Sequence, residues 1–308
     1  MPGWDVRHGR AVSSALRAGR PVVALESTIV AHGLPWPDNL RVARETEQAV
    51  RDAGATPATI GVIAGQITVG LDEEELARLA KSEDVLKLSP RDLAPAVVAG
   101  ADGATTVAST SVLAVQAGIG VFATGGLGGV HRQAHTSFDE SADLITLRDV
   151  PICVVCAGVK SILDVPATLE RLETFGVTVL GYRTRDFPGF YLANSGSTID
   201  WSVDTPEEAA RVFTARRAQR AAGATVVANP LPESEQLDPG LHDRVLAEGL
   251  ARAEAEGVAG KQVTPYLLAY FHRATGGASL KVNERIILRN AQLAARIAVA
   301  AGGSASDG

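Results

Sequence analysis

Short apolar runs alternate with longer amphipathic stretches along most of this 308-residue chain. The runs are rich in Val and Ile and apolar at consecutive positions, which is typical of strands whose two faces are both covered by helices. We therefore predict strands at residues 21–25, 59–64, 85–88, 104–108, 119–123, 152–156, 177–180 and 225–228.

The stretches between these runs carry helix start and stop signals. Asp72 and Glu75 form a capping box. Thr205 and Glu208 form a second one around an N1 proline, and Gly54 is a suitable residue after a helix end. The alternation favours a three-layer α/β/α fold with a largely parallel central sheet and a helical C-terminal part. We predict helices at residues 39–53, 73–81, 162–175, 205–222, 235–256 and 282–301.

The chain shows no internal repeat and no low-complexity linker. We therefore predict a single domain over residues 1–301 and a flexible Gly/Ser-rich tail over residues 302–308. Residues 188–203 form the longest irregular stretch before the helical last third. The sequence Asn194-Ser195-Gly196 within it predicts a turn or hairpin tip, one that could reach a neighbouring subunit.

Composition narrows the class of protein. Hydrophobic residues make up 46% of the chain, enough for a large buried core. The net charge of −6 and the pI of about 5.6, without a basic stripe, argue against a nucleic-acid partner. Two cysteines exclude a disulfide framework, and no apolar run is long enough to span a bilayer. The polar N-terminus lacks a signal core, so we expect a reducing, cytoplasmic location.

Three familiar motifs occur in the wrong context. Gly118-Ile-Gly120 resembles a dinucleotide fingerprint, but it enters a strand instead of opening a helix. Cys153 and Cys156 lie within an apolar strand, where residues three apart face opposite sides, so we interpret them as structural thiols. Val159 stands where a phosphate-binding P-loop requires Gly directly before Lys160, which excludes that motif.

Three ionisable residues stand at the ends of three different predicted strands: Glu26, Lys87 and Lys160. An ammonium group at the end of a buried strand is partly desolvated, which favours the neutral, nucleophilic amine. Lys160 is therefore a candidate for imine formation with a carbonyl carbon. A carboxyl group in the position of Glu26 is a candidate proton donor, because burial favours its protonated form. A salt-bridged lysine is the alternative for Lys160 considered alone.

Two neighbouring segments carry further polar chemistry. Residues 124–132 contain four glycines in five residues after an apolar strand, which lets backbone N–H groups approach an anion; a plain tight turn is the alternative. Asp139 and Asp143 are four residues apart with hydroxyls between them, a set that suits a hard, hydrated divalent cation, although such clusters also begin helices. His131 and His135 lack the glutamate of a zinc helix, so zinc is disfavoured.

The chain resembles the pseudouridine-5′-phosphate glycosidases, also called the indigoidine synthase A family. The resemblance extends from about residue 22 to residue 301, and its motifs occur in the family's order and spacing. They include Glu26-Ser-Thr-Ile-Val-Ala-His-Gly, Lys87-Leu-Ser-Pro-Arg-Asp and Val159-Lys-Ser-Ile-Leu-Asp. The matching stretches are residues 24–37, 87–93, 104–110, 123–132, 136–143 and 154–164.

The resemblance implies a lyase that reversibly splits the C-glycosidic bond of pseudouridine 5′-phosphate into uracil and ribose 5-phosphate. It implies that Lys160 is the imine-forming nucleophile, Glu26 the proton donor and Asp139 the one protein ligand of a Mn²⁺ ion otherwise held by water. It further implies a homotrimer with the site near a subunit boundary. The substrate-binding positions it implies are Lys87, Val107, Ser141, Ala142, Asp143 and Asn283.

Our own hypothesis for the phosphate is that the 125–129 backbone, including Gly126, holds it together with His131 or Lys87. Two other functions remain open: a lysine-imine aldolase or lyase for another sugar phosphate, and a non-catalytic sugar-phosphate sensor. A sensor would be expected to have a damaged site, whereas Glu26, Asp139 and Lys160 are all present. An assay for a C-linked product of uracil and ribose 5-phosphate distinguishes the glycosidase from these two alternatives.

Overall fold

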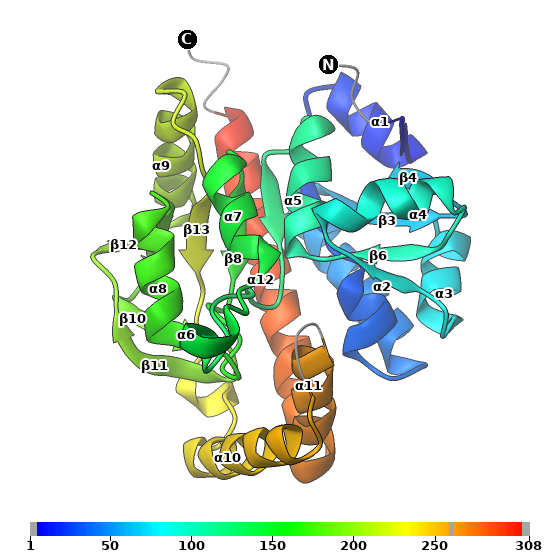
Figure 1. Cartoon of the computed structure of the whole chain (residues 1–308). Coiled ribbons are helices and arrows are strands. Elements are labelled where there is room, and N and C mark those ends of the chain that lie inside the picture. Colours follow the sequence, from blue (N-terminus) through cyan, green and yellow to red (C-terminus); the bar gives the residue numbers. More distant parts are fainter. Residues whose placement is uncertain (1–4, 259–261, 304–308) are drawn as a thin grey trace.

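A computed structural model describes residues 5–258 and 262–303 of the chain. Its centre is one sheet in which most neighbouring strands run parallel, as the sequence predicts (Figure 1). The order along the sheet is β1 (Val6–His8), β4 (Gln66–Val69), β3 (Thr56–Ile63), β2 (Val22–Leu25), β7 (Val121–Ala123), β8 (Cys153–Cys156), β13 (Thr225–Ala228), β9 (Thr178–Tyr182) and β12 (Trp201–Val203). At one end, β6 (Gly103–Thr105) pairs with β3 and with β5 (Leu86–Leu88).

Helices cover both faces of this sheet. Alternate residues of the central strands are therefore buried in two different cores, one on each side. Val154 and Cys156 of β8 belong to one core and Cys153 and Val155 to the other. Residues of α1 (Arg10–Arg17), α5 (Val107–Gln116), α7 (Ala142–Asp149) and α8 (Val165–Thr174) fill the first core. Residues of α2 (Asp38–Asp52), α9 (Pro206–Ala218) and α12 (Ala278–Gly303) fill the second. The three-layer α/β/α prediction is confirmed.

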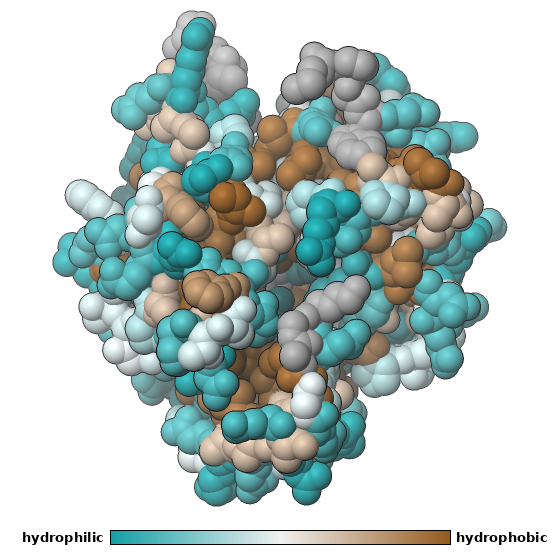
Figure 2. Space-filling model, in the orientation of Figure 1, coloured by the Kyte–Doolittle hydropathy of each residue, from teal (hydrophilic) through white to brown (hydrophobic). Residues whose placement is uncertain are grey.

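The remaining helices lie around the edge of the layered body. They are α3 (Glu73–Lys81), α4 (Leu93–Val98), the short α6 (Ala134–Ser137), α10 (Pro239–Ala255) and α11 (Val263–Ala274). In Figure 1, α10 and α11 lie below the sheet and α12 runs up through its centre. Hydrophilic side chains cover most of this face of the molecule, while hydrophobic ones gather toward its middle (Figure 2). No helix within the described ranges is long and apolar enough to cross a membrane.

Two sequence motifs are placed as predicted. The capping box of Asp72 and Glu75 opens α3, with the Glu75 N–H donating to Asp72 Oδ1 at 2.9 Å. Cys153 and Cys156 are fully buried free thiols on opposite faces of β8. Burial raises the pKa of each thiol to about 12. Both are therefore structural residues rather than nucleophiles or metal ligands.

Three predicted elements require correction. The predicted strand 104–108 ends at Thr105, because Thr106 and Ser109 form a capping box that starts α5 at Val107. The predicted helix 162–175 begins at Val165, where the Asp164 carboxylate accepts the Ala167 N–H at 3.0 Å. Of the predicted tail, Gly302 and Gly303 still belong to α12, and residues 304–308 lie outside the described residues.

The predicted turn at Asn194-Ser195-Gly196 is also wrong. These residues lie within strand β11 (Leu192–Thr198), which pairs antiparallel with β10 (Asp186–Gly189). The hairpin tip is Phe190–Tyr191 instead, and the Phe190 N–H donates to Ala157 O at 2.9 Å. Gly196 adopts φ +84°, so the turn-like sequence marks an irregular position inside the strand and not its end.

Candidate active site

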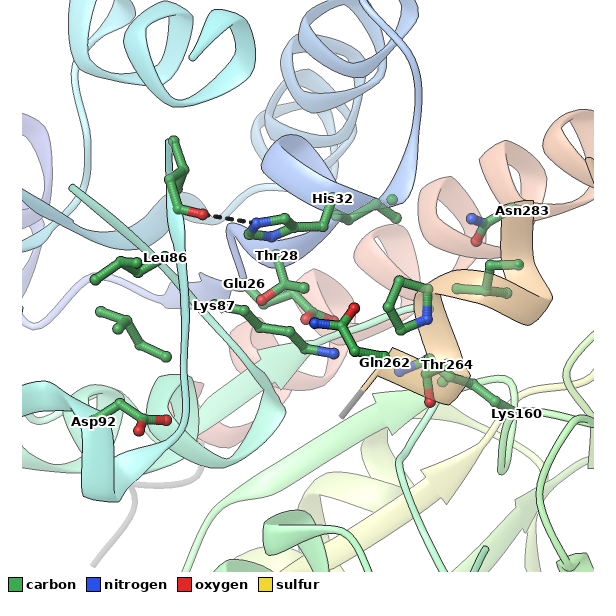
Figure 3. Close-up of a pocket in the computed structure, with 18 of the residues that line it drawn as sticks. Glu26, Thr28, His32, Leu86, Lys87, Asp92, Lys160, Gln262, Thr264 and Asn283 are labelled. Carbon is green, nitrogen blue, oxygen red and sulfur yellow. Dashed lines mark hydrogen bonds between the residues drawn. The ribbon is translucent and has the colours of Figure 1, made fainter. Parts of the chain in front are cut away.

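A cavity of about 550 Å³ lies at the carboxyl ends of β2, β5 and β8, the position where open α/β sheets bind ligands. Its size suits a small molecule such as a nucleotide. One part of the wall is apolar and comes from β5, α4 and α11. The polar lining residues include Glu26, Thr28, His32, Lys87, Lys160, Gln262, Thr264 and Asn283 (Figure 3).

Glu26 directly follows β2 and is half-buried at the cavity wall. The Thr124 hydroxyl donates a hydrogen bond to Glu26 Oε1. Burial raises the pKa of Glu26, and the nearby charges of Lys160 and Lys87 only partly oppose this effect. The carboxyl group thus retains its proton to higher pH than an exposed glutamate, as a general acid requires.

Lys160 follows β8 and lines the same cavity, half-buried. Its backbone is fixed by pairing with the glycine-rich segment: the Lys160 N–H donates to Leu127 O at 3.1 Å, and the Leu127 N–H donates to Gly158 O at 2.9 Å. In the view of Figure 3, Glu26 lies beside Lys87, and Lys160 reaches the cavity from the other side. The structure therefore brings together the three ionisable residues that the sequence singled out, although Lys87 lies within β5 and not after its end.

His32 is a lining residue that the sequence reasoning did not single out. It lies in η1 (Ile29–Gly33), a single π-helical turn, and turns of this kind occur frequently at functional sites. His32 Nε2 lies 2.9 Å from Val85 O, within hydrogen-bond distance. Burial lowers the pKa of His32, so the imidazole is neutral at physiological pH.

The glycine-rich segment packs closely against its neighbours. A Cβ on Gly126 would lie 2.7 Å from Phe190, and Cβ atoms on Gly128 and Gly129 would clash with Ser141 and Thr168. The N–H groups of Leu127 and Gly128 already donate to Gly158 O and Asp143 Oδ2. Close packing accordingly explains these glycines, and only Gly125 and Gly126 line the cavity.

Several positions expected to bind substrate lie outside the cavity wall. Val107 is 2% exposed at the start of α5 and does not line the cavity. Ser141 caps α7 and accepts the Asp143 N–H at 3.2 Å. Ala142 follows it. The Asp143 carboxylate is buried and accepts N–H bonds from Gly128 at 2.8 Å and Ala108 at 3.0 Å. Asp143 thus holds the backbone of the glycine-rich segment and of α5 without lining the cavity itself.

Asp139 and His131 form a second cluster, adjacent to the first. Asp139 Oδ2 lies 3.7 Å from His131 Nδ1, which is longer than a hydrogen bond, and the carboxylate side chain is 29% exposed. Burial lowers the pKa of His131, and the charges of Lys87 and Lys160 act in the same direction. His131 is therefore close enough to both lysines to sense their charges, although neither His131 nor Asp139 lines the cavity.

A divalent cation at Asp139 is compatible with this arrangement. Within residues 5–258 and 262–303, no group of three His, Cys, Asp or Glu side chains could enclose an ion. A partly exposed carboxylate suits a cation that keeps most of its water. The residues present thus fit the hydrated, singly ligated ion that the sequence resemblance implies, and a fully enclosed metal site does not fit them.

Asn283 reaches the cavity from α12 (Figure 3). Its residue is 6% exposed, and Oδ1 is buried without a hydrogen-bond partner among the described residues. A buried amide oxygen without a partner destabilises the protein, so a ligand that donates a hydrogen bond there would relieve the cost. This geometry supports Asn283 as a substrate-binding residue.

Several lining residues lie in parts of the chain where the sequence pattern gives little functional signal. Phe190 enters from the β10–β11 hairpin, while Gln262, Thr264, Pro265 and Leu268 come from α11 and the residue before it. Phe190 follows Gly189 in a stretch read as irregular, and its φ of +61° places it in the left-handed region. The aromatic-rich sequence 187–191 was the only available signal.

Comparison with known proteins agrees with this geometry. Residues 11–300 match the family model described as indigoidine synthase A like protein. The chain is 69% identical over 298 residues to pseudouridine-5′-phosphate glycosidase from Salinispora tropica, covering 96% of this chain and 92% of that one. It is 48% identical to the Alkaliphilus metalliredigens protein of the same name, over 94% of both chains.

Two solved structures share the fold. The prealnumycin C-glycosynthase AlnA, in complex with ribulose 5-phosphate, superposes with a TM-score of 0.91, 36% identity and complete coverage of both chains. An indigoidine synthase A-like protein from Thermotoga maritima superposes with a TM-score of 0.86 and 33% identity, over 96% of this chain and 95% of that one.

Proposed function

Because the chain belongs to the indigoidine synthase A-like family, we propose that it reversibly cleaves the C-glycosidic bond of pseudouridine 5′-phosphate, giving uracil and ribose 5-phosphate. The observation that carries the proposal is that Lys160 and Glu26 line one cavity and interact electrostatically, with burial raising the pKa of Glu26. A nucleophilic amine beside a protonated acid is the pair that opening a sugar ring requires.

A carbon–carbon glycosidic bond needs an electron sink, because the base has no leaving nitrogen to protonate. In our mechanism, Lys160 Nζ bonds to C1′ while the C1′–O4′ bond breaks and Glu26 gives its proton to O4′. The ring-opened sugar then carries both the lysine nitrogen and uracil on C1′. The structural support is that Glu26 and Lys160 line the same cavity and that the charge of Lys160 acts on the pKa of Glu26.

The second half of the reaction breaks the carbon–carbon bond. Uracil C5 takes up a proton, the C1′–C5 electron pair leaves with the base, and the lysine nitrogen lone pair forms the C1′=N bond. Water then adds to this imine and releases ribose 5-phosphate and the free amine of Lys160. Overall, one water is consumed, and the reverse sequence couples the base to the sugar.

The remaining candidate residues divide into those that line the cavity and those that lie outside its wall. We propose that Lys87, with His131, faces the phosphate, and that the unpartnered Oδ1 of Asn283 accepts a hydrogen bond from the substrate. We propose Mn²⁺ at Asp139, where a hydrated ion would hold and polarise water. Asp143 accepts the Gly128 N–H and the Ser141 N–H donates to Gly129 O, so both hold the glycine-rich segment, whereas Ala142 and Val107 lie outside the cavity wall.

The assembly is a separate proposal. Phe138, directly before Asp139, is 85% exposed, and Trp201 is 68% exposed. Exposed large hydrophobic residues are typical of protein contacts, which supports a homotrimer with the Asp139 segment near a subunit boundary. Light scattering behind size exclusion should give three times the chain mass of 32.0 kDa. Two free buried cysteines are in keeping with a reducing cytoplasm.

The decisive test couples uracil with ribose 5-phosphate. The protein with Mn²⁺ should yield pseudouridine 5′-phosphate, identified by mass and by the resistance of its C-linked base to acid. Lys160→Ala should yield none, whereas Lys281→Ala, a variant in α12, should match the wild type. A product with another acceptor but not uracil would indicate a different lysine-imine lyase, and no product with any acceptor would contradict the proposal.

A further inference from the structure

A chain of buried hydrogen bonds lies directly behind the proton donor. Thr124 is 3% exposed at the end of β7, where its N–H donates to Val155 O at 3.0 Å. Its hydroxyl donates to Glu26 Oε1. Thr124 therefore connects the backbone of the central strands to the carboxyl group in the cavity.

Asn290 of α12 holds this threonine from the other side. Its side chain is 1% exposed, and Nδ2 donates to Thr124 O at 2.8 Å and to Gly125 O at 3.4 Å. Asn290 Oδ1 accepts a hydrogen bond from Asn229 Nδ2 at 3.0 Å, and the Asn229 N–H donates to Cys156 O at 2.8 Å. Both polar ends of the buried amide are thus satisfied, which fixes its orientation.

We propose that Thr124 and Asn290 are positioning residues for Glu26: Asn290 clamps the Thr124–Gly125 backbone, and the Thr124 hydroxyl occupies Glu26 Oε1 so that Oε2 carries the catalytic proton. The inference rests on the proposed function, in which Glu26 donates a proton. A hydroxyl that donates to one carboxyl oxygen stabilises negative charge there, and the proton is then held by the other oxygen.

The charged groups that face Glu26 are Lys160 after β8, Lys87 on β5 and Asp143 on α7. The lysines lower the pKa of Glu26 and Asp143 raises it, while burial is the largest effect and raises it. Thr124 acts against burial. Removing its hydroxyl should therefore raise the pKa of Glu26 further. Because the protonated acid is the active form, activity should persist to higher pH.

The experiment compares Thr124→Val with Thr124→Ser. Glutamate carboxyl carbons are labelled with ¹³C, the Glu26 signal is assigned by its absence in Glu26→Gln, and its titration is followed by NMR without turnover. The valine variant should titrate at higher pH than the wild type, and the serine variant should match the wild type. In the cleavage assay, the pH at which kcat falls on the alkaline side of its profile should rise with the Glu26 pKa. The kcat of the valine variant at its optimum should fall by about tenfold or more.

Thr214→Val is the matched control, because the half-buried Thr214 hydroxyl donates to Ala210 O within α9, a helix that contributes no residue to the cavity. It should leave the titration unchanged. Asn290→Ala tests the clamp independently of Thr124→Val. It should shift the Glu26 titration upward less than Thr124→Val does, and should add no further shift in the double variant.

Unchanged or downward titration in Thr124→Val would overturn the role of Thr124, since a downward shift means that Glu26 donates to the hydroxyl. Additive shifts in the double variant would overturn the role of Asn290. These outcomes are separate from failure of the proposed function, because a wild type that never couples uracil can still be titrated. If Thr124→Val does not fold, Asn290→Ala and Thr124→Ser decide the question.

Discussion

The carboxylate of Asp143 and the backbone N–H of Gly128 are joined by a 2.8 Å hydrogen bond beneath the active-site cavity. The other Asp143 oxygen accepts the Ala108 N–H at 3.0 Å. One buried side chain thereby ties the glycine-rich segment to the start of α5. The segment that fixes the backbone of Lys160 is itself held by this carboxylate.

Asp143→Asn should break one of the two bonds, because the amide oxygen can accept one N–H group but the amide nitrogen cannot accept the other. We expect the variant to lose about 1–3 kcal/mol of unfolding free energy. Its KM for ribose 5-phosphate should also rise, since the cavity loses its supporting shell. Denaturant titration and steady-state kinetics measure the two effects. Asp149→Asn, at an exposed position of the same helix, is the control, and equal stability of the two variants would contradict this role.

Lys160 should be the residue that bonds to the sugar. Borohydride reduction in the presence of ribose 5-phosphate should add the mass of the reduced sugar to the peptide that contains Lys160. Lys160→Arg should give no adduct and lower kcat by about four orders of magnitude or more, because a guanidinium is not nucleophilic. Lys81→Arg, at the end of α3, should behave as the wild type. An adduct on any other lysine would refute the assignment.

Glu26→Gln should lower kcat by about 10² to 10⁴, the usual contribution of a general acid. It should also change stability with pH. Burial raises the pKa of Glu26, so its protonated form stabilises the fold at low pH and this contribution is lost as pH rises through the raised pKa. The Tm of Glu26→Gln minus the Tm of the wild type should therefore be more positive at pH 9 than at pH 5.

The control for this comparison is Glu45→Gln, at an exposed position of α2. Its Tm difference from the wild type should vary little between the two pH values. A wild type that gains stability over Glu26→Gln as pH rises would mean that the lysines, and not burial, determine the pKa of Glu26.

Mn²⁺ binding should depend on Asp139. Removing metal with a chelator should lower activity, and added Mn²⁺ should restore it. Asp139→Asn should weaken Mn²⁺ binding by about tenfold or more, because the ion loses its one carboxylate ligand. The loss of the free-ion EPR signal on titration with protein measures this binding. Asp84→Asn, an exposed variant, should bind as the wild type. Full activity in chelator would exclude the metal.

The sequence predicted the parts of this protein that local chemistry determines. Val-rich runs such as β8 and β13 are apolar on both faces, and the Asp72 capping box starts a helix at the expected residue. Glu26 and Lys160 could be placed together because both follow parallel strands, whose carboxyl ends share one edge of the sheet. The resemblance to a known family then assigned roles to positions that this geometry had already made candidates.

Other features depend on contacts between distant segments. Asn290 and its partner Thr124 are 166 residues apart, so no local pattern indicates their hydrogen bond. The hairpin tip lies at Phe190 because that segment pairs with Ala157 after β8, although Asn194–Gly196 carries the stronger turn signal. The glycines of residues 124–132 were read as an anion cradle, and their packing against Phe190, Ser141 and Thr168 became visible only in three dimensions.

The last long helix, α12, packs on β2, β7 and β8 and also contacts α2 and α9. Its inner face carries Asn283, which lines the cavity, and Asn290, which holds the threonine behind the acid. Residues 278–303 are made after every strand of the sheet. A nascent chain whose α12 is still inside the ribosomal exit tunnel cannot place either asparagine against the sheet, even if the sheet has formed. Synthesis from the N-terminus thus delays chemical competence until this helix has left the ribosome, and we expect messages cut short upstream of it to encode inert protein.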